Sequence, residues 1–124
     1  MVRIAEALAL REGCAYLLTG ESLGQVSSQT LPNLRAIDAA ASLVVLRPLI
    51  GFDKDETVRI AREIGTFEIS EGPEICDLLG PSHPATKASL GQVLAEEARL
   101  DVDGLVREAL EGAREERLIT GRAS

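Results

Sequence analysis

Aromatic residues are nearly absent from this sequence of 124 residues, which has no Trp, one Tyr and two Phe. Because 45% of the residues are nevertheless apolar, any core must be small and aliphatic, built from Leu, Ile, Val and Ala. The length predicts one domain of ordinary size.

Long apolar runs and cysteine-rich patterns are also missing. No stretch approaches the roughly 20 apolar residues of a membrane span. The first 13 residues, MVRIAEALALREG, have charges inside their apolar part, which is unlike a secretory signal. The two cysteines, Cys14 and Cys76, are too few for a disulfide framework and lack metal-ligand spacing. We therefore expect a cytoplasmic protein with no membrane contact and no metal-ligating residues.

Positive charge is scarce in the second part of the chain. Residues 1–52 carry four basic and four acidic side chains, whereas residues 53–124 carry nine and sixteen, so the net charge of −7 comes entirely from the second part. An acidic surface of this kind repels phosphate groups and is not typical of a nucleic-acid footprint. If nucleic acid is a partner, we expect other modules to bind it.

Hydrophobic periodicity predicts alternating helices and strands. Val58, Ala61 and Ile64 are expected to be buried by one of the helices, and Cys14 is expected to lie in the core. The two strands are expected to be buried, although a helical segment is also possible for the first. The expected helices span 2–12, 31–41, 53–65, 89–98 and 103–118, the strands span 15–18 and 43–46, and 66–88 is expected to be a loop. This order is typical of an α/β fold with parallel strands flanked by helices.

A polar loop with two glycines, TGESLGQVSSQT at 19–30, follows the first predicted strand. Its G-x-S-x-G pattern raises the possibility of a serine hydrolase with Ser22 as nucleophile and His83 as base. A nucleophile elbow, however, needs a helix immediately after the serine, and here more polar residues follow. The alternative is a loop that binds a ligand at the carboxyl end of a parallel strand, where glycines allow close approach. Its amide and hydroxyl groups favour a nucleotide over an ester, and Glu21 and Ser22 are among the candidate contacts.

Four stretches carry a resemblance to a known family: TGESLGQVSSQTLPNL, LRPLIGFDKDE, the pattern ARxIGT, and PEIC. Together they resemble the ATP-pyrophosphatase domain of the tRNA 4-thiouridine synthetase family, also known as a thiamine-biosynthesis sulfur-transfer protein. The resemblance covers residues 1 to about 95. It implies ATP-dependent adenylylation of a tRNA uridine followed by sulfur transfer from a persulfide, with a possible role in thiamine thiazole synthesis.

The resemblance also implies roles for individual residues. Gly20 and Gln29 match positions that contact the nucleotide, so the expected nucleotide-binding set is Gly20, Glu21, Ser22 and Gln29. Lys54 matches a lysine needed for activity, which would neutralise charge on transferring phosphates; otherwise it is a surface lysine at a helix start. Cys76 matches a cysteine that relays the persulfide in some members; otherwise it is an inert thiol.

The glycine- and serine-rich pyrophosphate loop of the family is absent from the sequence, as are its RNA-binding and rhodanese-like modules. We therefore expect a partial doubly wound fold, similar to adenine nucleotide alpha hydrolases. Residues 1–95 would form the C-terminal half of the ATP-pyrophosphatase-like domain, and 96–124 a helical extension.

The expected ligand is the adenylate portion of ATP, with Mg²⁺. A sulfur-donor protein is a possible partner, and tRNA would bind only through modules absent here. The alternative is a non-catalytic remnant that binds an adenine nucleotide or a partner protein. Because strands of the domain would lack neighbours, we also expect a homodimer.

Overall fold

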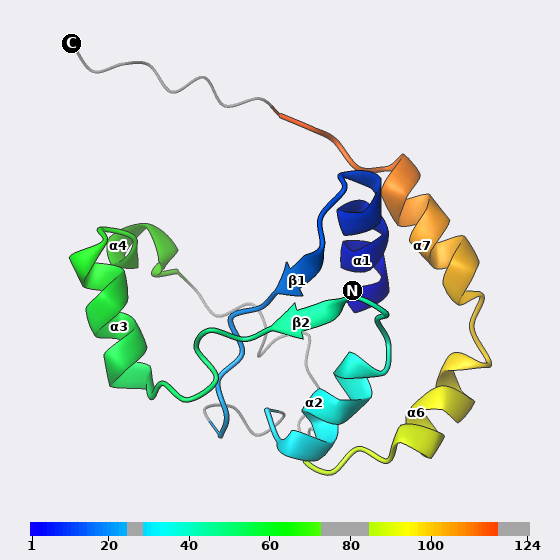
Figure 1. Ribbon diagram of the computed structural model, residues 1–124, viewed down its shortest axis with the longest axis horizontal. Coiled ribbons are helices and arrows are strands. Elements are labelled where there is room, and N and C mark those ends of the chain that lie inside the picture. Colours follow the sequence, from blue (N-terminus) through cyan, green and yellow to red (C-terminus); the bar gives the residue numbers. More distant parts are fainter. Residues whose placement is uncertain (25–28, 73–84, 117–124) are drawn as a thin grey trace.

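The computed structural model describes residues 1–24, 29–72 and 85–116. Within these residues, several helices pack beside a small two-stranded sheet, and one helical pair projects away from the rest (Figure 1). The elements are α1 (Val2–Arg11), β1 (Tyr16–Leu18), α2 (Leu31–Asp38), β2 (Val44–Leu46), α3 (Lys54–Glu63), α4 (Phe67–Ser70), α6 (Leu90–Glu97) and α7 (Val102–Glu111). None of the helices in this described part is long and apolar enough to cross a bilayer.

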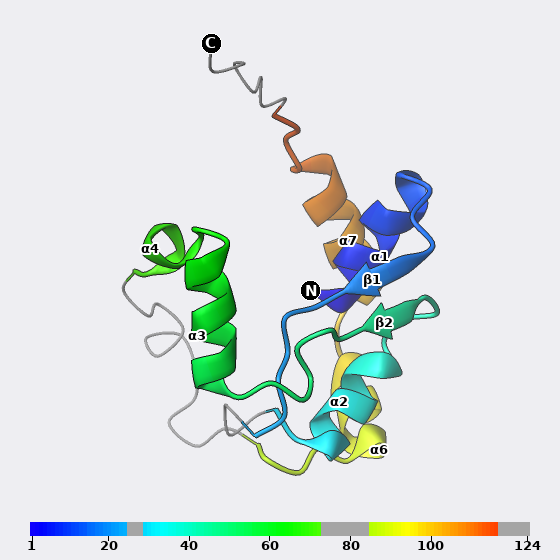
Figure 2. The ribbon, with the colours of Figure 1, turned by 60° about the vertical axis from the view of Figure 1, so that its left-hand side comes forward.

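The sheet confirms the predicted α/β class. β1 and β2 are parallel, with Tyr16 opposite Val44 and Leu18 opposite Leu46, and α2 forms the crossover between them. α1 packs against β1 and α7, whereas α2 packs against α6 (Figure 2). Parallel strands joined through a helix end at the same edge of the sheet, so the segments that follow β1 and β2 begin side by side.

One face of the sheet is open, which corrects the prediction of buried strands. Tyr16, Leu18, Val44 and Leu46 project from this face and are 52%, 64%, 65% and 42% exposed. Side chains alternate between the two faces of a strand, and the intervening residues are partly covered. The apolar runs identified the strands correctly, but burial also depends on what packs against each face.

The core is correspondingly small. Among the described residues, Ala9 and Leu34 are the buried hydrophobic side chains. Two predictions of burial are wrong: Ile64 is 67% exposed and Cys14 is exposed. Ile64 lies at the carboxyl end of α3, which packs on α4, and Cys14 lies in the turn after α1.

The predicted helix ends follow from local chemistry. Gly13 and Gly65 have φ angles of 70° and 73°, a left-handed conformation that favours glycine and terminates helices. At the start of α3, the Asp53 carboxylate accepts a hydrogen bond from the Glu56 backbone N–H at 2.8 Å, and the Glu56 carboxylate accepts one from the Asp53 N–H at 2.9 Å. This is the predicted capping box.

Two helix predictions need correction. The segment 66–88 was expected to be a loop, but it contains α4, whose Phe67 ring packs under the Arg62 guanidinium at 4.5 Å. A four-residue helix is too short to show periodicity. The last helix was expected to reach residue 118, but α7 ends at Glu111 and is capped by Gly112.

Glu6 ties α1 to the start of β2. Its carboxylate accepts hydrogen bonds from the backbone N–H of Leu43 and from the hydroxyl and N–H of Ser42, and these bonds lower its pKa. Folding stability from a carboxylate with a lowered pKa is present above the unfolded-state value of 4.5 and is lost as pH falls through the folded-state value.

We therefore expect the midpoint of urea unfolding to fall less steeply below pH 4.5 in Glu6→Gln than in the unaltered chain. Exposed Glu68 on α4 provides the control, since Glu68→Gln should leave the pH profile unchanged. Identical acid profiles for the unaltered chain and Glu6→Gln would contradict this assignment.

Candidate functional site

The loops that follow β1 and β2 are joined by hydrogen bonds. The Thr19 N–H donates to the Leu46 carbonyl at 3.0 Å, and the Leu23 N–H donates to the Ile50 carbonyl at 3.1 Å. The loop at 19–24 is therefore fixed against the segment 47–53 that leads to α3. This edge is where parallel α/β sheets bind their ligands.

Ser22 makes the most buried of these connections. It is 8% exposed, and its hydroxyl donates to the Phe52 carbonyl at 2.6 Å. A hydroxyl whose proton is committed to a carbonyl is not activated by a general base. The geometry therefore disfavours the hydrolase interpretation, and His83, its proposed base, lies outside the described residues. The Ser22 oxygen keeps lone pairs that can accept a hydrogen bond, so its role in nucleotide binding stays a prediction.

Gln29 closes the loop from the other side. Its side-chain oxygen accepts from the Ser22 N–H at 3.3 Å, and its backbone carbonyl accepts from the Gly24 N–H at 3.1 Å. The NH₂ group of Gln29 donates to no partner within the described part of the chain. Gly24 has a φ of 74°, which accounts for glycine at the turn.

Gly20 has no such conformational reason to be glycine. Its φ is not in the left-handed region, and a Cβ there would meet nothing within 4 Å among the described residues. Close approach of a ligand would account for glycine at this position. Together with the Gln29 amide, this fits the predicted nucleotide loop.

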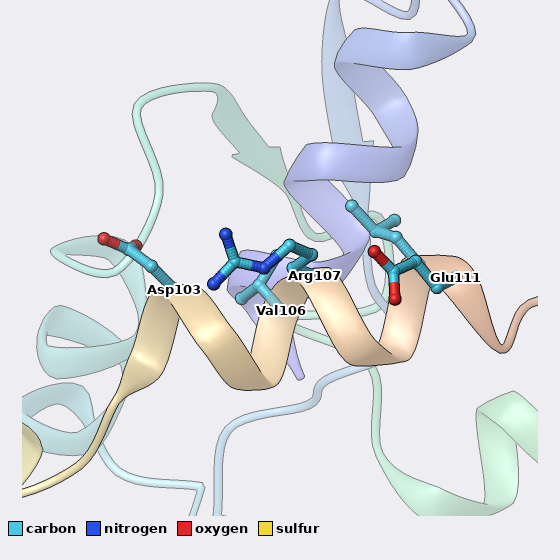
Figure 3. A pocket seen from close by; sticks show the side chains of 5 residues that line it. Asp103, Val106, Arg107 and Glu111 are labelled. Carbon is cyan, nitrogen blue, oxygen red and sulfur yellow. The ribbon is translucent and has the colours of Figure 1, made fainter.

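A cavity of about 900 Å³ lies beside the loop. Glu21 and Gln29 contribute polar side chains to it, while α1, α2, α6 and α7 supply a mainly apolar wall that includes Ile4, Ile37 and Val106. An apolar cavity with few polar groups at one side is typical of small-molecule sites. By contrast, a smaller pocket of about 310 Å³ is formed by α7 alone, where Asp103, Arg107 and Glu111 project along one face (Figure 3).

Arg47, which no sequence pattern indicated, contacts Glu21 at the wall of the cavity. Its side chain is 10% exposed and forms ion pairs with Glu21 and Asp38, each at 2.7 Å. Burial by itself lowers the pKa of Arg47. The hydrogen bonds to Asp38 and Glu21 raise this pKa by more, so it lies above its ordinary value. The sequence feature that could have indicated Arg47 is its position at the end of the second predicted strand, next to the edge where ligands bind.

The two predicted catalytic residues are not brought to this cavity by any described contact. Lys54 is exposed at the first turn of α3 and forms no ion pair within the described residues. Cys76 lies outside the described residues. The structure thus describes part of the predicted nucleotide-binding loop, and the roles of this loop, Lys54 and Cys76 stay predictions.

Comparisons with known proteins agree on one family. The family model described as "Thiamine biosynthesis protein (ThiI)" matches residues 1–102. A protein of Thermus thermophilus named "Probable tRNA sulfurtransferase" is 54% identical over 112 residues, which cover 89% of this chain and 28% of the relative. A protein of the same name from Moorella thermoacetica is 50% identical over 113 residues, covering 90% and 29%. The chain thus spans less than a third of the length of these relatives.

A solved structure gives the same result. The crystal structure of a 4-thiouridine synthetase in complex with RNA and bound ATP matches with a TM-score of 0.82 and 41% sequence identity. The match covers 90% of this chain and 30% of that one. A family model that matches most of the chain and a structural match at this identity lead to one conclusion: the chain belongs to the ThiI family of thiamine biosynthesis proteins.

Proposed function

We propose that this chain forms part of an ATP-dependent tRNA sulfurtransferase that makes 4-thiouridine. The observation that carries the proposal is the structural match to a 4-thiouridine synthetase complexed with RNA and ATP. A role in thiamine thiazole synthesis is a further part of the proposal, supported by the family description. The proposed boundary between the ATP-pyrophosphatase-like domain (1–95) and the helical extension (96–124) falls within α6.

The loop after β1 would bind the adenylate portion of ATP. Gly20 gives room for the ligand, while Glu21 and Gln29 offer an acceptor and a donor at the wall of the cavity. ATP supplies the phosphoryl chemistry that activates an oxygen for replacement by sulfur. The described carboxylates form no cluster that could hold a metal ion, so we assign no residues of this part to Mg²⁺.

Lys54 and Cys76 complete the proposed machinery. An ammonium group near the ligand edge of the sheet can stabilise negative charge that develops on phosphates. Cys76 would relay the persulfide from a sulfur-donor protein. Binding of an adenine nucleotide or a partner protein without turnover is the second candidate. It is supported by the position of Lys54, which does not line the cavity in the described part of the chain; tRNA would then bind through other modules.

Substitution of Gln29 tests the nucleotide site. We expect Gln29→Ala to weaken AMP binding by roughly two- to tenfold, the range for loss of one hydrogen bond, as measured by calorimetry on the 124-residue chain. Exposed Gln92 on α6 is the matched control, and Gln92→Ala should bind AMP like the unaltered chain. Failure of the unaltered chain to bind either AMP or ATP would refute the proposal for this chain.

We further propose that the chain forms a homodimer in solution. The proposal rests on the open face of the sheet, where four apolar side chains are paired in register and exposed. A two-fold axis would place this face against its copy, because a self-complementary patch satisfies that symmetry.

A further inference from the structure

We propose that Arg47 is a positioning residue, which orients Glu21 so that its carboxylate accepts a hydrogen bond from the nucleoside part of the bound nucleotide. The inference rests on the proposed function and deepens it by naming the part of the ligand that this wall of the cavity recognises. The contact between Glu21 and Arg47 does not follow from their spacing in the sequence.

The Arg47 guanidinium joins three elements. It extends from the end of β2, and its Nε donates to Glu21 in the loop after β1 at 2.7 Å. Its Nη2 donates to Asp38 at the end of α2, also at 2.7 Å. A planar guanidinium holds such partners in fixed directions, which a lysine ammonium does not. With Arg47 only 10% exposed, solvent competes weakly for these bonds.

The hydrogen bonds at Glu21 fall on one oxygen. Oε2 accepts from both the Arg47 guanidinium and the Thr19 hydroxyl, the latter at 2.9 Å. Oε1 accepts no hydrogen bond within the described residues, although Glu21 lines the same cavity as Gln29. The carboxylate is therefore fixed through one oxygen and leaves the other as an acceptor.

A free carboxylate oxygen selects among the parts of a nucleotide. It accepts from hydroxyl and amino groups, which belong to the ribose and the base, and it repels phosphate oxygens. Without Arg47, the Glu21 carboxylate, which is 18% exposed, would lose its ion-pair partner. A partly buried carboxylate without its cation turns toward water or takes up a proton, and in either case the acceptor is lost from its position.

Adenosine and AMP together test this inference, because they differ only in the phosphate. Calorimetry on the 124-residue chain should show Arg47→Met weakening both ligands by about tenfold, the effect of one charge-assisted hydrogen bond. Arg47→Lys, which can pair with Glu21 but cannot fork to Asp38, should fall between Arg47→Met and the unaltered chain. In a Glu21→Gln background, Arg47→Met should add little further loss.

The control is Arg59→Met, which removes an exposed ion pair with Glu63 and should leave both affinities unchanged. Loss of AMP affinity alone would overturn the inference, since Arg47 would then be acting on the phosphate. Unchanged affinity for both ligands in Arg47→Met and Arg47→Lys would also overturn it.

Hydrogen exchange tests the positioning role of Arg47 even if the proposed function fails. If the unaltered chain binds neither ligand, the proposed function fails and the nucleoside contact fails with it. The positioning role is then decided by the amides of Ser22, Leu23 and Gly24, which donate hydrogen bonds within the site. Arg47→Met should speed their exchange at least about fivefold relative to the amides of α7, and equal exchange would overturn the positioning role.

Discussion

Replacement of Leu34 by alanine is expected to remove a large part of the folding stability of the chain. Leu34 is 7% exposed and is one of two buried hydrophobic residues in the described part of the chain. Truncation of a buried leucine costs about 2–5 kcal/mol, whereas small domains have about 5 kcal/mol of stability at the low end of the range. Circular dichroism with a urea titration measures the fraction folded.

Leu31 provides the matched control, because it is in the same helix and is 68% exposed. Leu31→Ala removes the same atoms from the same element but creates no cavity, so the urea midpoint should shift little. Equal shifts for Leu31→Ala and Leu34→Ala would show that the side chain of Leu34 is not part of a core.

Substitution of Leu18 by lysine is expected to halve the mass of the particle in solution. The proposed dimer buries the open face of the sheet, and an interface of this kind needs more than about 1,000 Å² in total. A lysine in its centre would have to be desolvated, at a cost of several kcal/mol. Light scattering should give twice 13.2 kDa for the unaltered chain and the single mass for Leu18→Lys.

Ile69→Lys is the control, since Ile69 is 85% exposed on α4, far from the sheet in both views (Figures 1 and 2). This variant should stay dimeric. A monomeric mass for the unaltered chain, with its circular dichroism intact, would contradict the dimer. Dissociation of Ile69→Lys together with an intact Leu18→Lys dimer would place the interface elsewhere.

Local chemistry explains which structural features were predictable. Gly13 and Gly65 end their helices through their own backbone conformation, and the Asp53–Glu56 box involves residues three apart. By contrast, the exposure of Leu18 and Ile64 depends on what packs against them, which no local pattern contains. Their burial was therefore predicted wrongly although their elements were identified correctly.

The same distinction between local and long-range features applies to the candidate site. Glycine and amide residues after a strand indicate a ligand loop, and the resemblance implied Gly20 and Gln29. Arg47 went unnoticed because its partner Glu21 is 26 residues away in sequence, a pairing that only the parallel sheet brings about. The bond from Ser22 to the Phe52 carbonyl likewise spans 30 residues.

The pair α3 and α4 has the geometry of a lever attached at one end. It projects from the sheet (Figure 1), and its near end is fixed where Ser22 bonds to Phe52. The helix α3 has 10 residues and is therefore about 15 Å long. Because it begins two residues after Phe52, a rotation of about 10° around Phe52 would displace its far end by roughly 3–4 Å. Lys54, two residues from the pivot, moves by only about 1 Å. Any such rotation would therefore displace the backbone of Lys54, the proposed catalytic residue, much less than the outer end of α3.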